Sequence, residues 1–90
     1  KQKVVEIKEI KLRPVIGEHD YQIKMKQVRE FLSEGDKVKF TLRFRGREMA
    51  HQNIGFELMQ KVQTEIAEIA KIEQHPKLEG KQMVMMVSPK

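Results

Sequence analysis

Residues 42–55 read Leu42-Arg43-Phe44-Arg45-Gly46-Arg47-Glu48-Met49-Ala50-His51-Gln52-Asn53-Ile54-Gly55. The stretch begins as a strand, because the apolar residues Phe40, Leu42 and Phe44 alternate with polar ones. The alternation stops at Gly46, and a helical pattern follows. We therefore predict a strand that passes through an exposed loop into a long helix.

Positive charge is concentrated at this junction. Residues 37–47 contain no acidic residue, whereas the whole chain has a formal net charge of +5. The five basic residues of this segment equal that net charge, so the rest of the chain is balanced. They are Lys37, Lys39, Arg43, Arg45 and Arg47. Guanidinium forks suit phosphate oxygens and stacking on bases. Two interpretations are open: a surface that binds a polyanion, or a solvated sheet face that serves solubility.

Composition narrows the function classes. A chain of 90 residues forms one domain at most, and its core is modest. It contains no cysteine, which excludes disulfides and thiolate metal sites. No apolar run has the length of a membrane span, and no signal-peptide pattern occurs. Because the first residue is Lys1, we expect a fragment or a processed product. A pI near 9.6 favours acidic partners, nucleic acid above all.

The first half of the chain predicts a strand and a helix. Residues 4–13 form a Val- and Ile-rich strand that Pro14 ends, and its alternation slips in the middle, which indicates a bulge or burial on both faces. Residues 20–34 then show helical spacing, with Gly35 as the stop. The apolar stripe of this helix comprises Tyr21, Met25, Val28 and Leu32.

The second half predicts a strand at 36–45, a helix from 48–52 to about 70, and strands at 72–75 and 82–87. A turn-rich loop at 76–80 separates the last two strands. In the helix, Gly55 indicates either close packing against a neighbouring element or the close approach of something outside, and we favour close packing. The buried stripe of this helix is predicted to comprise Ile54, Leu58, Val62, Ile66 and Ile69.

The element order βαβαββ predicts the α/β (α+β) class. We expect a two-layer sandwich in which a four-stranded mixed sheet carries two helices on one face. The uncovered sheet face would carry Lys37, Lys39, Arg43 and Arg45.

Motifs for catalysis are missing from the sequence. The three histidines are well separated, no strand-turn-helix nucleophile elbow is present, and no phosphate-binding glycine loop occurs. We therefore expect no enzyme and no metal site. His51, which follows the arginines, can either bond a phosphate or pack locally.

The chain lacks the signatures of two common RNA-binding modules. The element order differs from that of an RNA-recognition motif, and the glycine loop of a KH domain is missing. Phe40 and Phe44 are expected to point into the core, which leaves Tyr21 as the aromatic residue able to contact a base. Recognition is then expected to rest on phosphates and shape, which suits a structured RNA.

Four stretches resemble the C-terminal domain of bacterial translation initiation factor 3. The most specific is residues 43–52, Arg43-Phe44-Arg45-Gly46-Arg47-Glu48-Met49-Ala50-His51-Gln52. The others are Glu9-Ile10-Lys11-Leu12-Arg13-Pro14, Asp20-Tyr21-Gln22-Ile23-Lys24 and Glu79-Gly80-Lys81-Gln82-Met83. The resemblance covers essentially the whole chain. It identifies residues 1–90 as a single ribosome-binding C-terminal domain, without the family's N-terminal domain and linker.

The resemblance implies a function without cofactor or covalent chemistry. Members of the family bind the small (30S) ribosomal subunit through 16S rRNA and keep the large subunit from joining. They also support the selection of initiator tRNA and the start codon on mRNA. The resemblance also implies that the chain is a cytoplasmic monomer with no membrane contact.

The resemblance also implies which residues bind RNA. They are Arg13, Tyr21, Lys24, Lys26, Arg43, Arg45, Arg47, Lys61 and Lys81. Lys26, Lys61 and Lys81 stand where some relatives have arginine, so charge is kept but the bidentate fork is lost. The alternative function is a small α/β protein-interaction or ligand-binding regulatory domain with an incidental basic face. Steep salt dependence of RNA binding distinguishes the first function from the second.

Overall fold

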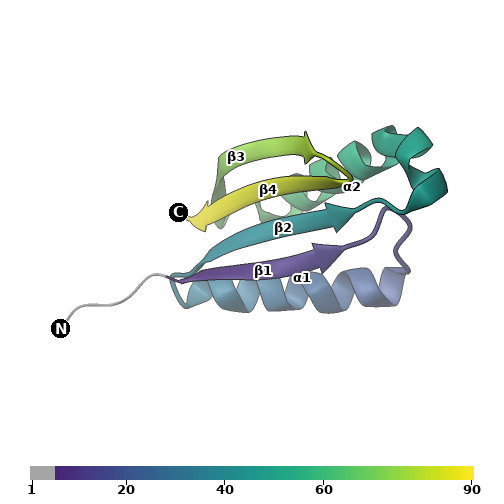
Figure 1. Ribbon diagram of the computed structural model, residues 1–90. Coiled ribbons are helices and arrows are strands. Elements are labelled where there is room, and N and C mark those ends of the chain that lie inside the picture. Colours follow the sequence, from purple (N-terminus) through teal and green to yellow (C-terminus); the bar gives the residue numbers. More distant parts are fainter. Residues whose placement is uncertain (1–5) are drawn as a thin grey trace.

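Two α-helices and four strands follow one another in the predicted order, βαβαββ, in the computed structural model, which describes residues 6–90 (Figure 1). The elements are β1 (Ile7–Leu12), α1 (Glu18–Ser33), β2 (Lys37–Arg43), the 3-10 helix η1 (Gly46–His51), α2 (Gln52–Ile66), β3 (Ala70–Glu79) and β4 (Gln82–Pro89). The short helix η1 is the one element that was not predicted separately.

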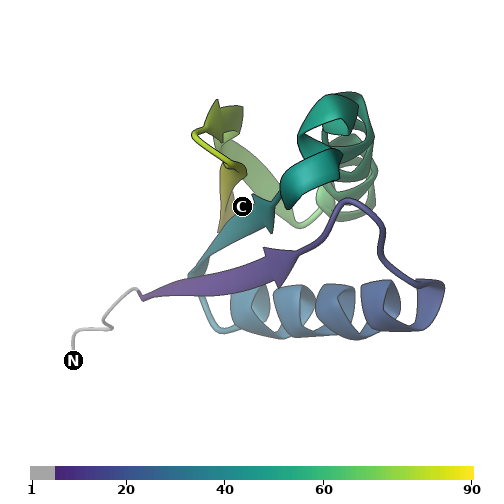
Figure 2. The ribbon, with the colours of Figure 1, turned by 45° about the vertical axis from the view of Figure 1, so that its right-hand side comes forward.

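The sheet is mixed and has the strand order β1-β2-β4-β3. β1 and β2 are parallel, as a helical crossover through α1 requires, and β4 is antiparallel to both of its neighbours. A short turn joins β3 to β4, and β4 lies between β2 and β3. Both helices cover the same face of this sheet, as Figures 1 and 2 show. The predicted two-layer sandwich is confirmed.

The core lies between that face and the helices. Phe40, Leu42 and Phe44 are at most 1% exposed, which confirms their predicted inward direction. From β4, Met83 and Met85 face the same core. Alternation along β2 and β4 therefore decides which side of the sheet the helices cover.

Helix α1 is built as its sequence predicts, although it begins two residues earlier. Its buried residues are Tyr21, Met25, Val28 and Leu32. At its C-terminus, the amide of Asp36 donates to the carbonyl of Phe31, and the amide of Gly35 donates to that of Leu32. These two bonds form a Schellman motif, and Gly35 has the positive φ of 90° that the motif needs. The predicted glycine stop is confirmed.

The first strand departs from its prediction. Residues 4 and 5 of the predicted strand lie outside the described residues. From Ile7 to Leu12 the register with β2 is continuous, so the predicted bulge does not occur there. Burial on both faces is also wrong, because the side chain of Ile7 is 58% exposed while Ile10 and Leu12 are buried. The slip in the apolar pattern reflects this exposed edge residue.

The third strand is longer than predicted. It runs from Ala70 to Glu79, through the residues that were expected to form a loop. Pro76 lies within it, where the register with β4 is irregular between Gln74 and Lys77. A proline is tolerated at such a point on an edge strand, because no amide hydrogen is required there. The prediction of a loop at 76–80 was therefore wrong.

Helix α2 ends at Ile66, earlier than predicted, and its buried stripe is shifted. Gly55, Met59, Val62 and Ile66 are buried, whereas Ile54 and Leu58 are only partly covered. Ile69 lies beyond the helix and is 42% exposed, so its predicted place in the stripe was wrong. The shift arises because Gly55 faces β2.

Close packing explains Gly55, as predicted. A Cβ atom at this position would lie 2.7 Å from Cζ of Phe44 and 3.4 Å from Cδ2 of Leu42. Glycine therefore lets α2 approach the strand that leads into the arginine stretch.

Candidate nucleic-acid interface

Basic side chains gather where β1 and β2 end. The two strands are parallel neighbours in a register that pairs Leu12 with Leu42. Arg13, which follows β1, therefore lies beside Arg43, which ends β2. The margin of the sheet formed by the carboxyl ends of these two strands is here called the edge. Arg45 comes two residues later, in extended conformation. The topology thus places arginines from distant parts of the sequence at one edge.

A groove at this edge, here called the basic groove, collects four of the predicted residues. Arg13, Lys24, Arg43 and Arg45 line it. Lys11 lines it as well and was missed by sequence reasoning. The available signal was its spacing of two from Arg13, which places both on one side of an extended chain. Two acids, Asp20 and Glu48, also line the groove.

Glu48 is engaged in holding the turn after β2. Its Oε1 accepts a hydrogen bond of 2.8 Å from the backbone amide of Arg45, and its own amide donates to the Arg45 carbonyl at 2.6 Å. These bonds close the first turn of η1. Glu48 forms no ion pair with an arginine among residues 6–90, and Arg45 and Arg47 are exposed on either side of Gly46.

The turn between β3 and β4 is tied to the same junction. The amide of Phe44 donates a 2.8 Å hydrogen bond to the carbonyl of Lys81. This bond continues the pairing of β2 and β4 past Arg43 and Gln82. Lys81 is therefore held next to the arginine stretch, although it does not line the basic groove.

Most of the predicted basic residues have no ionic partner among residues 6–90. No ion pair of this part of the chain involves Arg43, Arg45 or Arg47, and all three are exposed. The same holds for Arg13, Lys26 and Lys81, while Lys24 is unpaired but partly covered. Such cations keep their full capacity for an external anion.

The uncovered sheet face is less basic than predicted. Lys37 forms an ion pair of 3.5 Å with Glu73. A hydrogen bond from Ser88 and the charge of Lys37 lower the pKa of the Glu73 carboxyl. Arg45 lies beyond the end of β2 at Arg43, so the strand predicted at 36–45 is shorter at this end. Lys39 and Arg43 of β2 form no ion pair among residues 6–90, so unpaired charge remains on this face as well as at the strand ends.

Tyr21 does not have the exposure that was predicted for it. It is only 1% exposed, and Nζ of Lys61 lies 4.3 Å from the centre of its ring. Its hydroxyl is buried and has no hydrogen-bond partner in the described part of the chain. Burial is the main cause that raises the pKa of this hydroxyl, and the nearby carboxylate of Glu65 raises it further. The apolar stripe that begins at Tyr21 draws the ring into the core.

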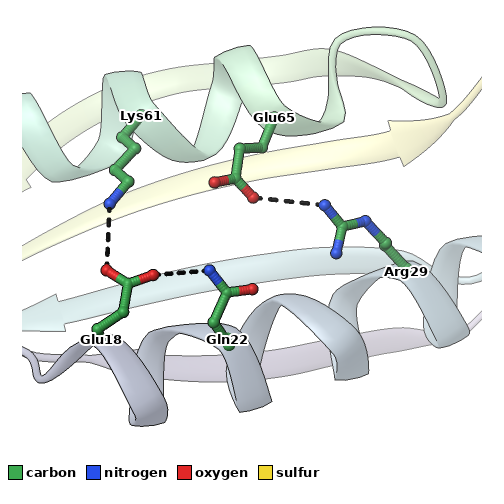
Figure 3. A network of polar contacts seen from close by, with 5 residues as sticks. All are labelled: Glu18, Gln22, Arg29, Lys61 and Glu65. Atoms are coloured by element: carbon green, nitrogen blue, oxygen red, sulfur yellow. Dashed lines mark hydrogen bonds and ion pairs between the residues drawn. The ribbon is translucent and has the colours of Figure 1, made fainter.

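Lys61 lies between the two helices rather than in the basic groove. Figure 3 shows its ammonium directed at Glu18 of α1, with Nζ 3.9 Å from Oε1. Arg29 of α1 and Glu65 of α2 form a second pair at 3.4 Å. The hollow that Lys61 lines shares Val15 and Ile16 with the basic groove, so the two are neighbours.

Residues 6–90 contain no group of three side chains that could hold a metal ion. None of the helices in this part of the chain is both long and apolar enough to cross a membrane. His51 is exposed on η1.

Comparison with known proteins adds the family. The family model described as translation initiation factor IF-3, C-terminal domain, matches residues 5–90. The chain belongs to this family. Relatives named translation initiation factor IF-3 include those of Xanthobacter autotrophicus, 64% identical over 90 residues, and Bartonella quintana, 61% identical over 90 residues. The relative from Zymomonas mobilis is 64% identical over 89 residues.

The chain spans about half the length of these IF-3 relatives. The matches cover 100%, 100% and 99% of the chain, but 52%, 52% and 50% of the three relatives. The IF-3 family is non-enzymatic, in agreement with the expectation that the chain is no enzyme.

Proposed function

We propose that the chain binds the small ribosomal subunit through 16S rRNA and prevents the large subunit from joining. The gathering of unpaired cations at one sheet edge, in a chain of the IF-3 C-terminal family, carries this proposal. In this role the chain acts by occupancy. Bound protein fills a surface where the two subunits would meet. The chain also supports the selection of initiator tRNA and the start codon.

The shape of the basic groove favours phosphates over bases. Its charged walls come from β1, the start of α1 and the end of β2, and no aromatic side chain lines it. Arginine forks can hold two phosphate oxygens each, whereas lysines supply point charges. Cations fixed on three elements fit one spatial arrangement of phosphates, as a folded RNA presents them.

The proposed RNA contacts follow from this geometry. Arg13, Lys24, Arg43 and Arg45 hold phosphates in the groove, together with Lys11. The remaining contacts are Lys26, Arg47, Lys61 and Lys81, which extend the positive surface beyond the groove. Tyr21 supports this surface from below instead of touching a base. The chain works as a monomer in the cytoplasm and needs no cofactor.

Subunit joining tests the proposal. Purified small and large subunits are mixed with the chain, and the fraction of joined ribosomes is measured by light scattering or sedimentation. We expect the chain to lower that fraction in a concentration-dependent manner. Unchanged joining at concentrations where the chain saturates small subunits would exclude the occupancy mechanism.

A further inference from the structure

Lys61 is held between α1 and α2 without a close acceptor. At 3.9 Å its contact with Glu18 is an ion pair too long for a hydrogen bond, and no side-chain hydrogen bond of Lys61 occurs in residues 6–90. One Glu18 oxygen, Oε2, already accepts a bond of 2.7 Å from Gln22 (Figure 3). The ammonium therefore has donors to spare, and its side chain is 52% exposed.

Tyr21 supplies the floor beneath this ammonium. The ring is buried, and Nζ of Lys61 lies 4.3 Å from its centre, within the range of a cation–π contact. A buried ring cannot move with the flexible lysine, so the contact selects one region of space for the charge. The neighbouring pair of Arg29 and Glu65 is closer, at 3.4 Å, and includes a hydrogen bond.

We propose that Tyr21 is a positioning residue that holds Lys61 for a phosphate of the bound RNA, and that this phosphate replaces Glu18. This inference rests on the proposed function. A phosphate oxygen at hydrogen-bond distance is a better acceptor than a carboxylate 3.9 Å away. The hollow of Lys61 adjoins the basic groove at Val15 and Ile16, so one RNA backbone can reach both.

Removal of the competing carboxylate is the first test. The probe is purified small ribosomal subunits, and the Kd is measured for Glu18→Gln and for the matched control Glu57→Gln. Glu57 lines the same hollow but forms no ion pair within the described residues. We expect Glu18→Gln to tighten binding by about two- to fivefold, the range of an exposed ion pair. Glu57→Gln should give a smaller change.

The gain must depend on Lys61. In a Lys61→Met background, Glu18→Gln is expected to leave the Kd unchanged. An equal gain with and without Lys61, or an equal gain from Glu57→Gln, would overturn the exchange of Glu18 for phosphate. Failure of the parent chain to bind small subunits would remove the proposed function and this inference together. Binding by the parent without coupling between Glu18 and Lys61 would remove the inference alone.

The role of Tyr21 is tested by its ring. Tyr21→Phe keeps the ring and should keep the Kd, whereas Tyr21→Leu should weaken binding by about two- to fivefold, as for an exposed cation–π contact. The loss should vanish in the Lys61→Met background. A role in folding alone would weaken Tyr21→Leu equally in both backgrounds, and that result would contradict positioning. Circular dichroism confirms that each variant is folded.

Discussion

At the scale of single residues, Tyr21 is buried because of its place on helix α1. It begins the apolar stripe of α1, and stripe residues become buried. Its hydroxyl accordingly enters the core without a hydrogen-bond partner in the described structure. The contact with Lys61 depends on tertiary packing of α1 against α2, which no spacing within one helix reveals.

The buried hydroxyl of Tyr21 predicts a pH dependence of stability. Burial raises the pKa of this group above its ordinary value of 10.0. When the pH rises above 10.0, Tyr21 loses its phenolic proton in the unfolded chain but retains it in the folded chain. The free energy of unfolding therefore falls as pH rises, by at most about 1.4 kcal/mol per pH unit from this group.

This dependence is measurable because Tyr21 is the single tyrosine and the chain has no tryptophan. Phenolate absorbance during an alkaline titration reports its ionisation directly. Denaturant unfolding of the parent and of Tyr21→Phe between neutral pH and pH about 11 isolates its effect on stability. We expect the alkaline loss to be smaller in Tyr21→Phe. Ionisation at the ordinary pKa in the folded chain would contradict the burial.

At the scale of elements, the junction between β2 and α2 is set by one glycine. Alanine at Gly55 would favour the helix by about 1 kcal/mol but would place a Cβ atom 2.7 Å from the ring of Phe44. That ring is 1% exposed and belongs to the core, where side chains are close-packed. Overpacking of a filled core costs about 1–3 kcal/mol.

Gly55→Ala is therefore expected to lower the free energy of unfolding by about 1 kcal/mol, despite its better helix propensity. Phe44→Leu shortens the facing side chain and should reduce or reverse the effect of Gly55→Ala in the double variant. Chemical denaturation of the parent, both single variants and the double variant measures this coupling. Stabilisation by Gly55→Ala alone would show that helix and strand are not in close contact.

Elements with a clear hydrophobic period were predictable from the sequence. The length of an edge strand and the exact set of buried positions in a helix were not. The alternation of Phe40, Leu42 and Phe44 and the glycine stop at Gly35 are local signals, and both predictions are confirmed. The length of β3 was not local information. Pro76 breaks a strand in isolation but is tolerated on a sheet edge, and the edge position follows from the strand order.

The candidate site divides in the same way. Arginine spacing in residues 43–47 indicated an anion-binding surface, and the structure brings Arg43 and Arg45 into the basic groove. The contributions of Lys11 and Arg13 depend on the parallel pairing of β1 with β2, which brings distant segments to one edge. RNA binding by each of these residues stays a prediction.

At the scale of the whole molecule, the charge is arranged for binding at one end. The formal net charge of +5 comes from 18 basic and 13 acidic residues. Acids neutralise bases between the helices and on the open sheet face, as in the pairs Arg29–Glu65 and Lys37–Glu73. The edge where β1 and β2 end keeps its unpaired arginines, which favours one orientation toward a polyanion.

Binding to small ribosomal subunits should therefore depend steeply on salt. Each neutralised phosphate contributes about −0.7 to −0.9 to the slope of log K against log salt concentration. If Arg13, Lys24, Arg43 and Arg45 each hold one phosphate, a slope of about −3 to −4 is expected from the groove alone. Titrations at several KCl concentrations measure it. A slope near zero would contradict phosphate binding.

The most direct measurement compares two triple variants of equal charge for binding to purified small subunits. One variant replaces Arg43, Arg45 and Arg47 by alanine. The other replaces Lys39, Lys71 and Lys90 by alanine. Lys39 lies on β2, Lys71 on β3 and Lys90 beyond the end of β4, and none of them lines the basic groove. We predict that the arginine variant loses at least tenfold in affinity, or about 1.4 kcal/mol, while the lysine variant stays much closer to the parent. Equal losses in the two folded variants would show that net charge alone drives binding and would contradict a site at the ends of β1 and β2.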